Sequence, residues 1–208
     1  MKNAVAFTLV AAALGTGGVL SAANEGPWMV RVRAVNIKPA DKSDPIAALG
    51  IPADKITVST KTIPEVDFTY FFTPNFAAEL ILTYPQQHDV KVAGTFIGTF
   101  KHLPPTLTAQ WHFLPGETFS PYIGAGLNLT LLSDVKLAVP GVGGLDLNSS
   151  SVGPALQAGV DIKVAPQWSL NLDVKYVQIR SDVKLNGTKI SAVQVDPMLI
   201  GLGLGYRF

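Results

Sequence analysis

The sequence lacks cysteine, lacks an excess of either charge and, after residue 23, lacks any long uninterrupted apolar run. Without cysteine, disulfide bonds cannot hold the fold together. A transmembrane helix needs about 20 consecutive apolar residues, so the chain after residue 23 contains no candidate for one. The formal net charge is only +1 over 208 residues, which gives no broad electrostatic attraction to nucleic acid.

The first 23 residues have the pattern of a secretory signal peptide. Lys2 supplies a positive charge, residues 4–20 are mostly small and apolar, and residues 21–23 (Ser-Ala-Ala) form a small-residue cleavage site. A membrane anchor is the alternative, but a stretch of about 17 small residues interrupted by glycines is a poor permanent span. We therefore expect residues 1–23 to be removed and residues 24–208 to form one domain.

The rest of the chain is hydrophobic even though it lacks a membrane helix. Hydrophobic residues make up 48% of the sequence and the mean hydropathy is +0.30. Apolar residues alternate with small or polar ones, most clearly over 152–164. Seven more segments repeat the pattern, at 28–37, 62–72, 76–84, 106–113, 121–132, 168–180 and 195–208. A closed barrel needs only alternate residues to be apolar, so we predict an all-β fold: an eight-stranded antiparallel transmembrane β-barrel.

Connections of two lengths separate these segments. Residues 73–75, 114–120 and 165–167 are short, whereas 38–61, 85–105, 133–151 and 181–194 are long. Within the first long connection, residues 45–49 could form one helical turn and the remainder is expected to be irregular. Bacterial barrels place short turns in the periplasm, which predicts the outer membrane of a Gram-negative cell with both termini periplasmic. Aromatic residues next to the short turns fit a periplasmic girdle: Trp28, Phe72, Phe76, Trp111, Phe113, Trp168, Tyr206 and Phe208.

Three stretches of the sequence resemble the OmpW family of outer-membrane proteins: HLPPTLTAQWHF at 102–113, PYIGAGLN at 121–128 and GYRF at 205–208. The segment QAGVDIKVAPQW at 157–168 and the Asp196-Pro197 pair are also similar, but the long connections are not. The resemblance implies an eight-stranded barrel that passes small hydrophobic molecules across the outer membrane. It also implies that Phe208 is the signal read by the barrel-assembly machinery.

Charged residues occupy inward-facing positions in the middle and periplasmic parts of the predicted strands. They are Arg31, Arg33, Glu65, Asp67, Glu79, Asp161, Lys163, Asp173, Lys175 and Arg207. An eight-stranded barrel is barely wide enough for its own side chains, so paired charges would block a continuous aqueous channel. The alternative is that these pairs only fill the interior.

Nearer the outside, the inward-facing positions become apolar: Val35, Ile37, Ile63, Ile81, Leu132, Val177, Ile179, Val195 and Leu199. An apolar lumen surface that touches no lipid indicates a ligand site or covering loops. A hydrophobic solute that reached the charges would have to leave through the wall. Pro85, Pro104 and Pro105 mark a candidate lateral seam because proline donates no ladder hydrogen bond. Pro64, Pro154 and Pro197 are other candidates, and all six prolines could instead simply end strands or shape loops.

We expect no enzymatic activity, cofactor or metal. The sequence has three histidines, His88, His102 and His112, without a serine nucleophile motif or metal-ligand spacing. His88 and His102 are expected to be solvated loop residues, and His112 to point into the periplasmic half of the lumen. The expected partners are outer-membrane lipid, small hydrophobic solutes and the assembly machinery. The alternative function is a structural or adhesive barrel that acts through its long extracellular loops.

Overall fold

A computed structural model describes residues 26–47, 50–139 and 141–208, so the predicted signal peptide lies outside the described residues. Those residues form an all-β structure with the strands β1 (Trp28–Lys38), β2 (Lys42–Ser43), β3 (Ile56–Val58), β4 (Lys61–Phe71), β5 (Phe76–Leu82), β6 (Gln86–Val92), β7 (Thr95–Leu103), β8 (Thr106–His112), β9 (Phe119–Val139), β10 (Gly143–Leu147), β11 (Ser150–Lys163), β12 (Trp168–Val177), β13 (Arg180–Leu185), β14 (Thr188–Gln194) and β15 (Met198–Arg207). No helix in these ranges is long and apolar enough to cross a membrane.

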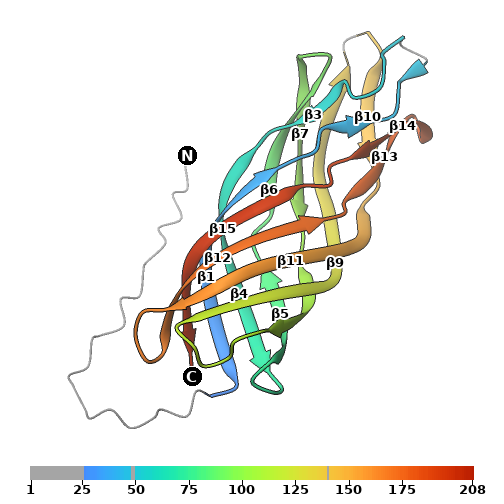
Figure 1. The fold of residues 1–208 in the computed structure, drawn as a ribbon. Helices are drawn as coiled ribbons and strands as arrows, with labels where there is room; N and C mark the ends of the chain where they lie inside the picture. The colour runs from blue at the N-terminus through green and yellow to red at the C-terminus, as the bar shows by residue number, and fades with distance from the viewer. Residues whose placement is uncertain (1–25, 48–49, 140) are drawn as a thin grey trace, which may run out of the picture.

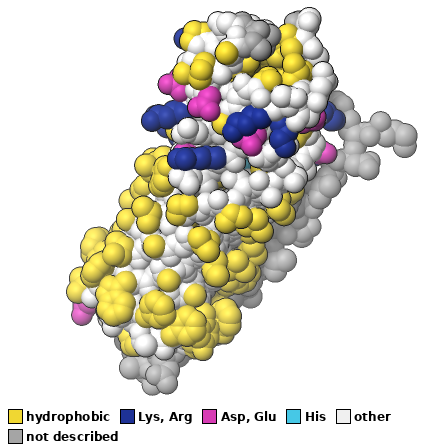
Figure 2. Space-filling view, turned by 90° about the vertical axis from the view of Figure 1, so that its right-hand side faces the viewer, with side chains coloured by type: hydrophobic (Ala, Val, Ile, Leu, Met, Phe, Trp, Pro, Cys, Tyr) yellow, Lys and Arg dark blue, Asp and Glu magenta, His cyan; other side chains and the backbone are white. Residues whose placement is uncertain are grey.

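Eight of the strands close into an antiparallel barrel, as the sequence predicted. The ladder runs β1–β4–β5–β8–β9–β11–β12–β15 and returns from β15 to β1, which leaves no open edge (Figure 1). Closure is what a lipid environment requires, because every backbone group must find a partner within the protein. Outward-facing side chains of these strands are apolar and exposed, and Figure 2 shows them covering the lower part of the molecule below a belt of charged side chains.

The long connections are not irregular loops, and the expectation for 38–61 was wrong. They form strands β2, β3, β6, β7, β10, β13 and β14, which pair in the order β3–β6–β7–β9–β10–β13–β14–β2 above the barrel. We call these strands, with the outer half of β9, the upper tier. Strand β9, which has 21 residues, continues from the barrel into the upper tier, and its outer half pairs with strands of that tier (Figure 1). Ala47 starts a turn closed by the Gly50 N–H, whereas residues 48–49 lie outside the described residues.

The short turns and both ends of the described chain lie at the same end of the barrel. Trp28 and Phe208 exchange backbone hydrogen bonds of 3.2 and 2.8 Å, which join the first strand to the last residue. The rings of Trp28 and Tyr70 pack edge to face with centroids 4.9 Å apart, and Trp168 packs on Tyr206 in a similar way. This aromatic girdle next to the short turns identifies the periplasmic end.

Candidate functional site

Charged side chains on five strands meet in the middle of the lumen. Arg31 and Arg33, both from β1, each place a guanidinium nitrogen 2.9 Å from the same oxygen of Glu79. Arg31 also binds Asp161 at 2.6 Å, although the two residues are 130 positions apart in the sequence. All four side chains are buried, so each charge relies on these partners rather than on water.

Arg33 extends the cluster towards the other wall of the barrel. Its guanidinium lies 3.3 Å from Glu65, 3.2 Å from Asp67 and 3.6 Å from Asp173. Lys175 bridges Glu65 and Asp173 from β12. These contacts join eight of the predicted lumen charges into one ion-pair network: Arg31, Arg33, Glu65, Asp67, Glu79, Asp161, Asp173 and Lys175.

Neutral side chains complete the ion-pair network, because five carboxylates face only three cations in it. Gln157 donates to Glu79 and Asp173 at 2.8 Å each, and Gln110 donates to Glu79 at 2.7 Å. The Tyr122 hydroxyl donates to Asp173 at 2.8 Å. The pattern of charged residues in the sequence did not indicate these donors, which occupy inward positions on β8, β9 and β11. The result is a polar layer that fills the barrel across its width.

Two predicted lumen charges lie below this layer. Lys163 and Arg207 line a pocket at the periplasmic end, where the Arg207 guanidinium sits 3.9 Å from the centre of the Phe71 ring. His112 lines the same pocket and stacks on Tyr122, so it lies in the periplasmic half as expected. Within the described residues, no group of three or more histidine, aspartate or glutamate side chains is arranged to hold a metal ion.

Above the ion-pair network the lumen is apolar. All nine predicted apolar residues are buried and point inward, but they lie at mid-height because the upper tier extends the lumen beyond them. A lower cavity of about 20 Å³ is lined by Thr83, by the seam residue Pro104 and by six of these nine apolar residues: Ile37, Ile63, Ile81, Val177, Ile179 and Leu199.

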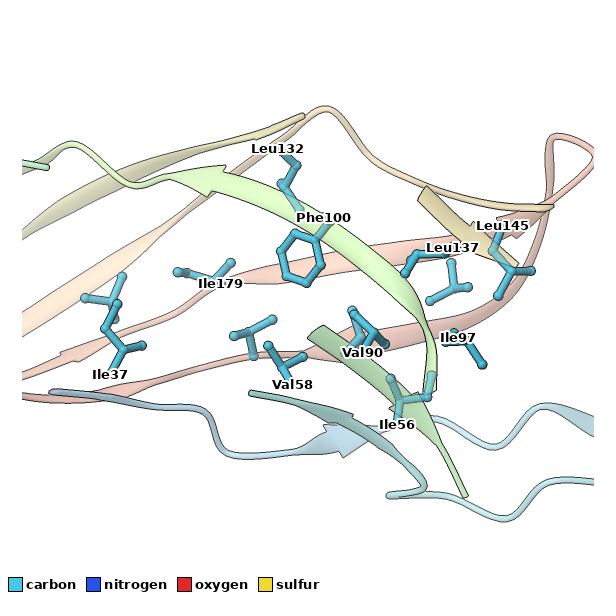
Figure 3. Packing of buried hydrophobic residues seen from close by; sticks show 14 of the residues in the cluster. Ile37, Ile56, Val58, Val90, Ile97, Phe100, Leu132, Leu137, Leu145 and Ile179 are labelled. Carbon is cyan, nitrogen blue, oxygen red and sulfur yellow. The ribbon is translucent and has the colours of Figure 1, made fainter. Parts of the chain in front are cut away.

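A second cavity of about 30 Å³ lies in the upper tier. Its apolar lining includes residues from segments that the sequence assigned to loops: Ile46, Ile56, Val58, Val90, Val92, Ile97, Phe100, Leu137, Leu145, Val183 and Val193. Figure 3 shows many of them converging from opposite walls. Each cavity holds only a few water-sized spheres, so a larger guest must displace side chains. Short stretches in which apolar and polar residues alternate, such as Ile56–Val58 and Val90–Val92, were the sequence pattern that could have indicated these inward-facing residues.

The wall beside the lower cavity has an unpaired segment at residues 83–85, between β5 and β6. Towards β8 and β7, strand pairing stops at Ile81–Thr106 and resumes at Gln86–His102, so residues 82–85 face Leu103, Pro104 and Pro105 without ladder pairs. Towards β4 it stops at Val66–Leu82, and the next backbone bond runs from Ser59 to Asp89. Residues 83–85 are thus outside the ladder on both edges.

Two of the other candidate prolines, Pro154 and Pro197, do not interrupt the wall in this way. The Pro154 carbonyl accepts the Gln178 N–H at 3.0 Å, and the Pro197 carbonyl accepts the Val177 N–H at 3.3 Å. Pro64 pairs with Ala34 of β1 on one edge, but on the other edge the ladder to β5 stops at Val66–Leu82, and its carbonyl accepts the Thr83 hydroxyl at 3.3 Å, so it borders the unpaired segment. The unpaired segment is thus bordered by Pro64, Pro104 and Pro105 and ends with Pro85.

The expectation that His88 and His102 are solvated was wrong. Both rings are buried in the lumen, stacked with centroids 4.8 Å apart, because β6 and β7 pair in the upper tier and direct these positions inward. They lie outside the membrane-spanning strands. Burial lowers the pKa of His102 to about 3, with a further contribution from neighbouring His88, and burial also lowers the pKa of His88. Both imidazoles are therefore neutral at physiological pH.

A closed antiparallel barrel with an apolar outer band, an aromatic girdle and a polar layer in the lumen defines an outer-membrane β-barrel protein. A family model described as the OmpW family matches residues 24–208, and the chain belongs to this family.

Individual relatives agree with this assignment. The chain is 39% identical over 193 residues to an uncharacterised outer-membrane protein, y4mB, of Sinorhizobium fredii, covering 90% of this chain and 82% of that one. It is 32% identical to outer membrane protein W of Escherichia coli over the full length of both. The crystal structure of OprG from Pseudomonas aeruginosa superposes with a TM-score of 0.75 at 27% identity, over 90% of this chain and 98% of that one.

Proposed function

We propose that this protein passively carries small hydrophobic molecules from the cell exterior into the outer membrane. The main observation that supports this proposal is the combination of three features: an apolar lumen, an ion-pair network that seals it below, and an unpaired wall segment beside the lower cavity. In this proposal the solute occupies the apolar lumen and leaves sideways past residues 83–85.

The ion-pair network makes direct passage unfavourable for an apolar solute. To cross it, the solute would have to separate buried ion pairs that it cannot replace with interactions of its own. The unpaired segment offers a route with a lower free-energy barrier, because no ladder hydrogen bonds have to break there. Pro85, Pro104 and Pro105 keep the route open, since none can donate a backbone hydrogen bond.

A relative supports the chemical class of the solute. The chain is 26% identical over 201 residues to a Pseudomonas aeruginosa protein named for a dibenzothiophene metabolism operon. Dibenzothiophene is a small, flat, apolar molecule, and a cavity lined by isoleucine, valine, leucine and phenylalanine suits such a solute.

One observation favours the alternative of a structural or adhesive barrel. The two cavities measure only about 20 and 30 Å³, so the side chains nearly fill the lumen when no solute is bound. In that alternative the upper tier acts as a rigid platform whose hairpin tips bind a surface or another protein.

A charge placed in the lower cavity separates these alternatives. Ile81→Asp should reduce uptake of a small apolar solute roughly tenfold or more, because an apolar guest cannot solvate the new carboxylate. The matched control is Asn36→Asp, which adds the same charge at an exposed position. Uptake into cells with and without each variant is the measurement, with folding checked by gel shift. A folded Ile81→Asp protein with normal uptake would mean that the solute does not use the lower cavity, and unmodified protein that adds nothing to uptake would favour the adhesive role.

We also infer that Phe208 is the residue read by the assembly machinery, as in the family that the chain resembles. Its backbone closes the barrel against Trp28, but its ring is exposed. Phe208→Ala keeps the backbone bonds and removes the ring. It should lower the amount of folded barrel in the outer membrane several-fold while leaving refolding in detergent unchanged. Normal membrane levels of Phe208→Ala, measured by heat-modifiable gel shift, would remove this role.

A further inference from the structure

Three polar side chains interrupt the apolar lumen beside the unpaired segment. Gln86 and His88 are inward-facing neighbours on β6, and His102 lies opposite Gln86 on β7. All three are at most 3% exposed. The rings of His88, His102 and Phe100 form a triangle, with the His88 centroid 4.8 Å from that of His102 and 6.0 Å from that of Phe100, and these two 6.2 Å apart. We call Gln86, His88 and His102 the polar subsite.

The hydrogen bonds of His88 fix its tautomer. Its Nδ1 lies 2.7 Å from the backbone carbonyl oxygen of Ser59. A carbonyl oxygen can only accept, so Nδ1 carries the proton and Nε2 of the neutral ring carries a lone pair. This Nε2 is buried and has no hydrogen-bond partner among the described residues. It is therefore an unused acceptor.

Gln86 presents a second unused acceptor. Its amide nitrogen donates to the Tyr84 carbonyl at 2.7 Å and to the Thr83 hydroxyl at 3.0 Å, which sets the orientation of the amide. The opposite atom, Oε1, is buried and has no partner within the described chain. The two bonds also tie Gln86 directly to the unpaired segment of the wall.

Two buried acceptors without donors are costly, at about 1–3 kcal/mol for each unsatisfied group. Proteins satisfy nearly all such atoms, and exceptions cluster where another molecule supplies the partner. Because both atoms are acceptors, the missing group must be a donor. An ether, a ketone or a hydrocarbon cannot supply it, whereas an alcohol, a phenol or an N–H group can.

The polar subsite lies on the path between the two cavities. Of the described residues, only His102 and Ile179 line both the upper and the lower cavity, and the lower cavity reaches Thr83 and Pro104 at the wall. A solute moving from the upper tier to the unpaired segment must pass the His102 ring, which covers His88. Movement of that ring opens access to the acceptor behind it.

We propose that the polar subsite binds the hydroxyl or N–H group of a small, otherwise apolar solute on its way to the wall. This proposal rests on the proposed transport function and narrows its substrate class to apolar molecules that carry one hydrogen-bond donor. The donor group binds His88 Nε2 or Gln86 Oε1, and the apolar body occupies the lower cavity between Ile63 and Leu199.

Three naphthalene derivatives of similar size test the subsite. 1-Naphthol carries a donor, 1-methoxynaphthalene only an acceptor, and 1-methylnaphthalene neither. Protein-dependent uptake into proteoliposomes should favour 1-naphthol. His88→Phe keeps the stacked ring and removes the acceptor, so it should lower uptake of 1-naphthol about five- to tenfold and leave the methyl compound unchanged. His112→Phe is the matched control, because His112 lies below the ion-pair network.

The outcomes separate the two proposals. Equal effects of His88→Phe on all three compounds would overturn the subsite and leave transport standing. If no compound enters faster with the protein than without it, both proposals fail. Nitrogen NMR of labelled histidine gives a readout independent of uptake: 1-naphthol, but not 1-methylnaphthalene, should shift the His88 Nε2 resonance of the protein in nanodiscs. An unchanged resonance at saturating 1-naphthol would overturn the subsite.

Discussion

Arg33→Met should lower the free energy of unfolding by about 3–5 kcal/mol, the usual cost of removing one partner from a buried ion pair. Arg33 contacts Glu65, Asp67, Glu79 and Asp173, so its removal leaves several buried carboxylates with fewer positive partners. Methionine replaces the apolar stem of arginine and removes the guanidinium. Urea unfolding in lipid vesicles, followed by tryptophan fluorescence and gel shift, is the measurement.

Arg180→Met is the matched control for Arg33→Met. The Arg180 side chain is 54% exposed and its ion pair with Asp196 spans 3.5 Å. Exposed pairs contribute at most about 1 kcal/mol, so this variant should stay close to the unmodified protein. Equal stability of the two variants would mean that the ion-pair network does not hold the lumen closed, so that a solute could pass through it directly.

Replacing Pro104 by valine and Pro105 by threonine should reduce uptake of an apolar solute at least several-fold. Both new residues carry an N–H group, and because successive N–H groups of a strand point to opposite sides, the one at position 104 can pair with the carbonyl groups of residues 82–85 and extend the ladder into the gap. Pro104 contributes only one apolar side chain to the lining of the lower cavity and valine keeps that position apolar, so the solute should still bind, as measured by fluorescence. Uptake should fall because release becomes slow.

Pro154→Val provides the same chemical change at a place where the wall is already continuous. The Pro154 carbonyl already accepts a bond from Gln178, so this variant should not alter uptake. Asp67→Asn should also matter little, because Asp67 belongs to the ion-pair network below the exit. Normal uptake by the Pro104 and Pro105 double variant, combined with higher uptake and conductance for Asp67→Asn, would mean that solutes pass straight through the barrel.

Alternation predicted the membrane-spanning strands closely. The expected segments 28–37 and 106–113 correspond to β1 (Trp28–Lys38) and β8 (Thr106–His112). Lipid on one face and a narrow lumen on the other impose a hydrophobicity pattern with a strict period of two residues, so these strands can be recognised from the sequence alone. The turns between them are short, which leaves little freedom in register.

The upper tier was not predictable in the same way. Strand β6 has the sequence QQHDVKV, in which half of the inward positions, Gln86 and His88, are polar. Its partners come from β3 and β7, and β7 in turn pairs with the outer half of β9. Such short strands are stable only within the assembled sheet, so their own composition indicates a loop.

The candidate site was likewise predictable from the sequence only in its barrel part. The inward facing of Arg31, Glu79 and Asp161 followed from alternation, but their meeting depends on strands from opposite sides of a closed barrel. The environment of His88 and His102 could not be predicted, because the upper tier that buries them was taken for loops. Unsatisfied acceptors become visible only when every neighbouring atom is placed.

Photo-crosslinking tests the route most directly. A small apolar diazirine, activated while it is being taken up by vesicles that contain the protein, labels the residues that it passes. The proposed function predicts adducts on Ile81, Thr83 and Pro104, at the lower cavity and the wall beside it. Adducts on Met29, Phe71 or Ser169, which line the periplasmic pocket below the ion-pair network, would show that the solute crosses the whole barrel and would contradict lateral release.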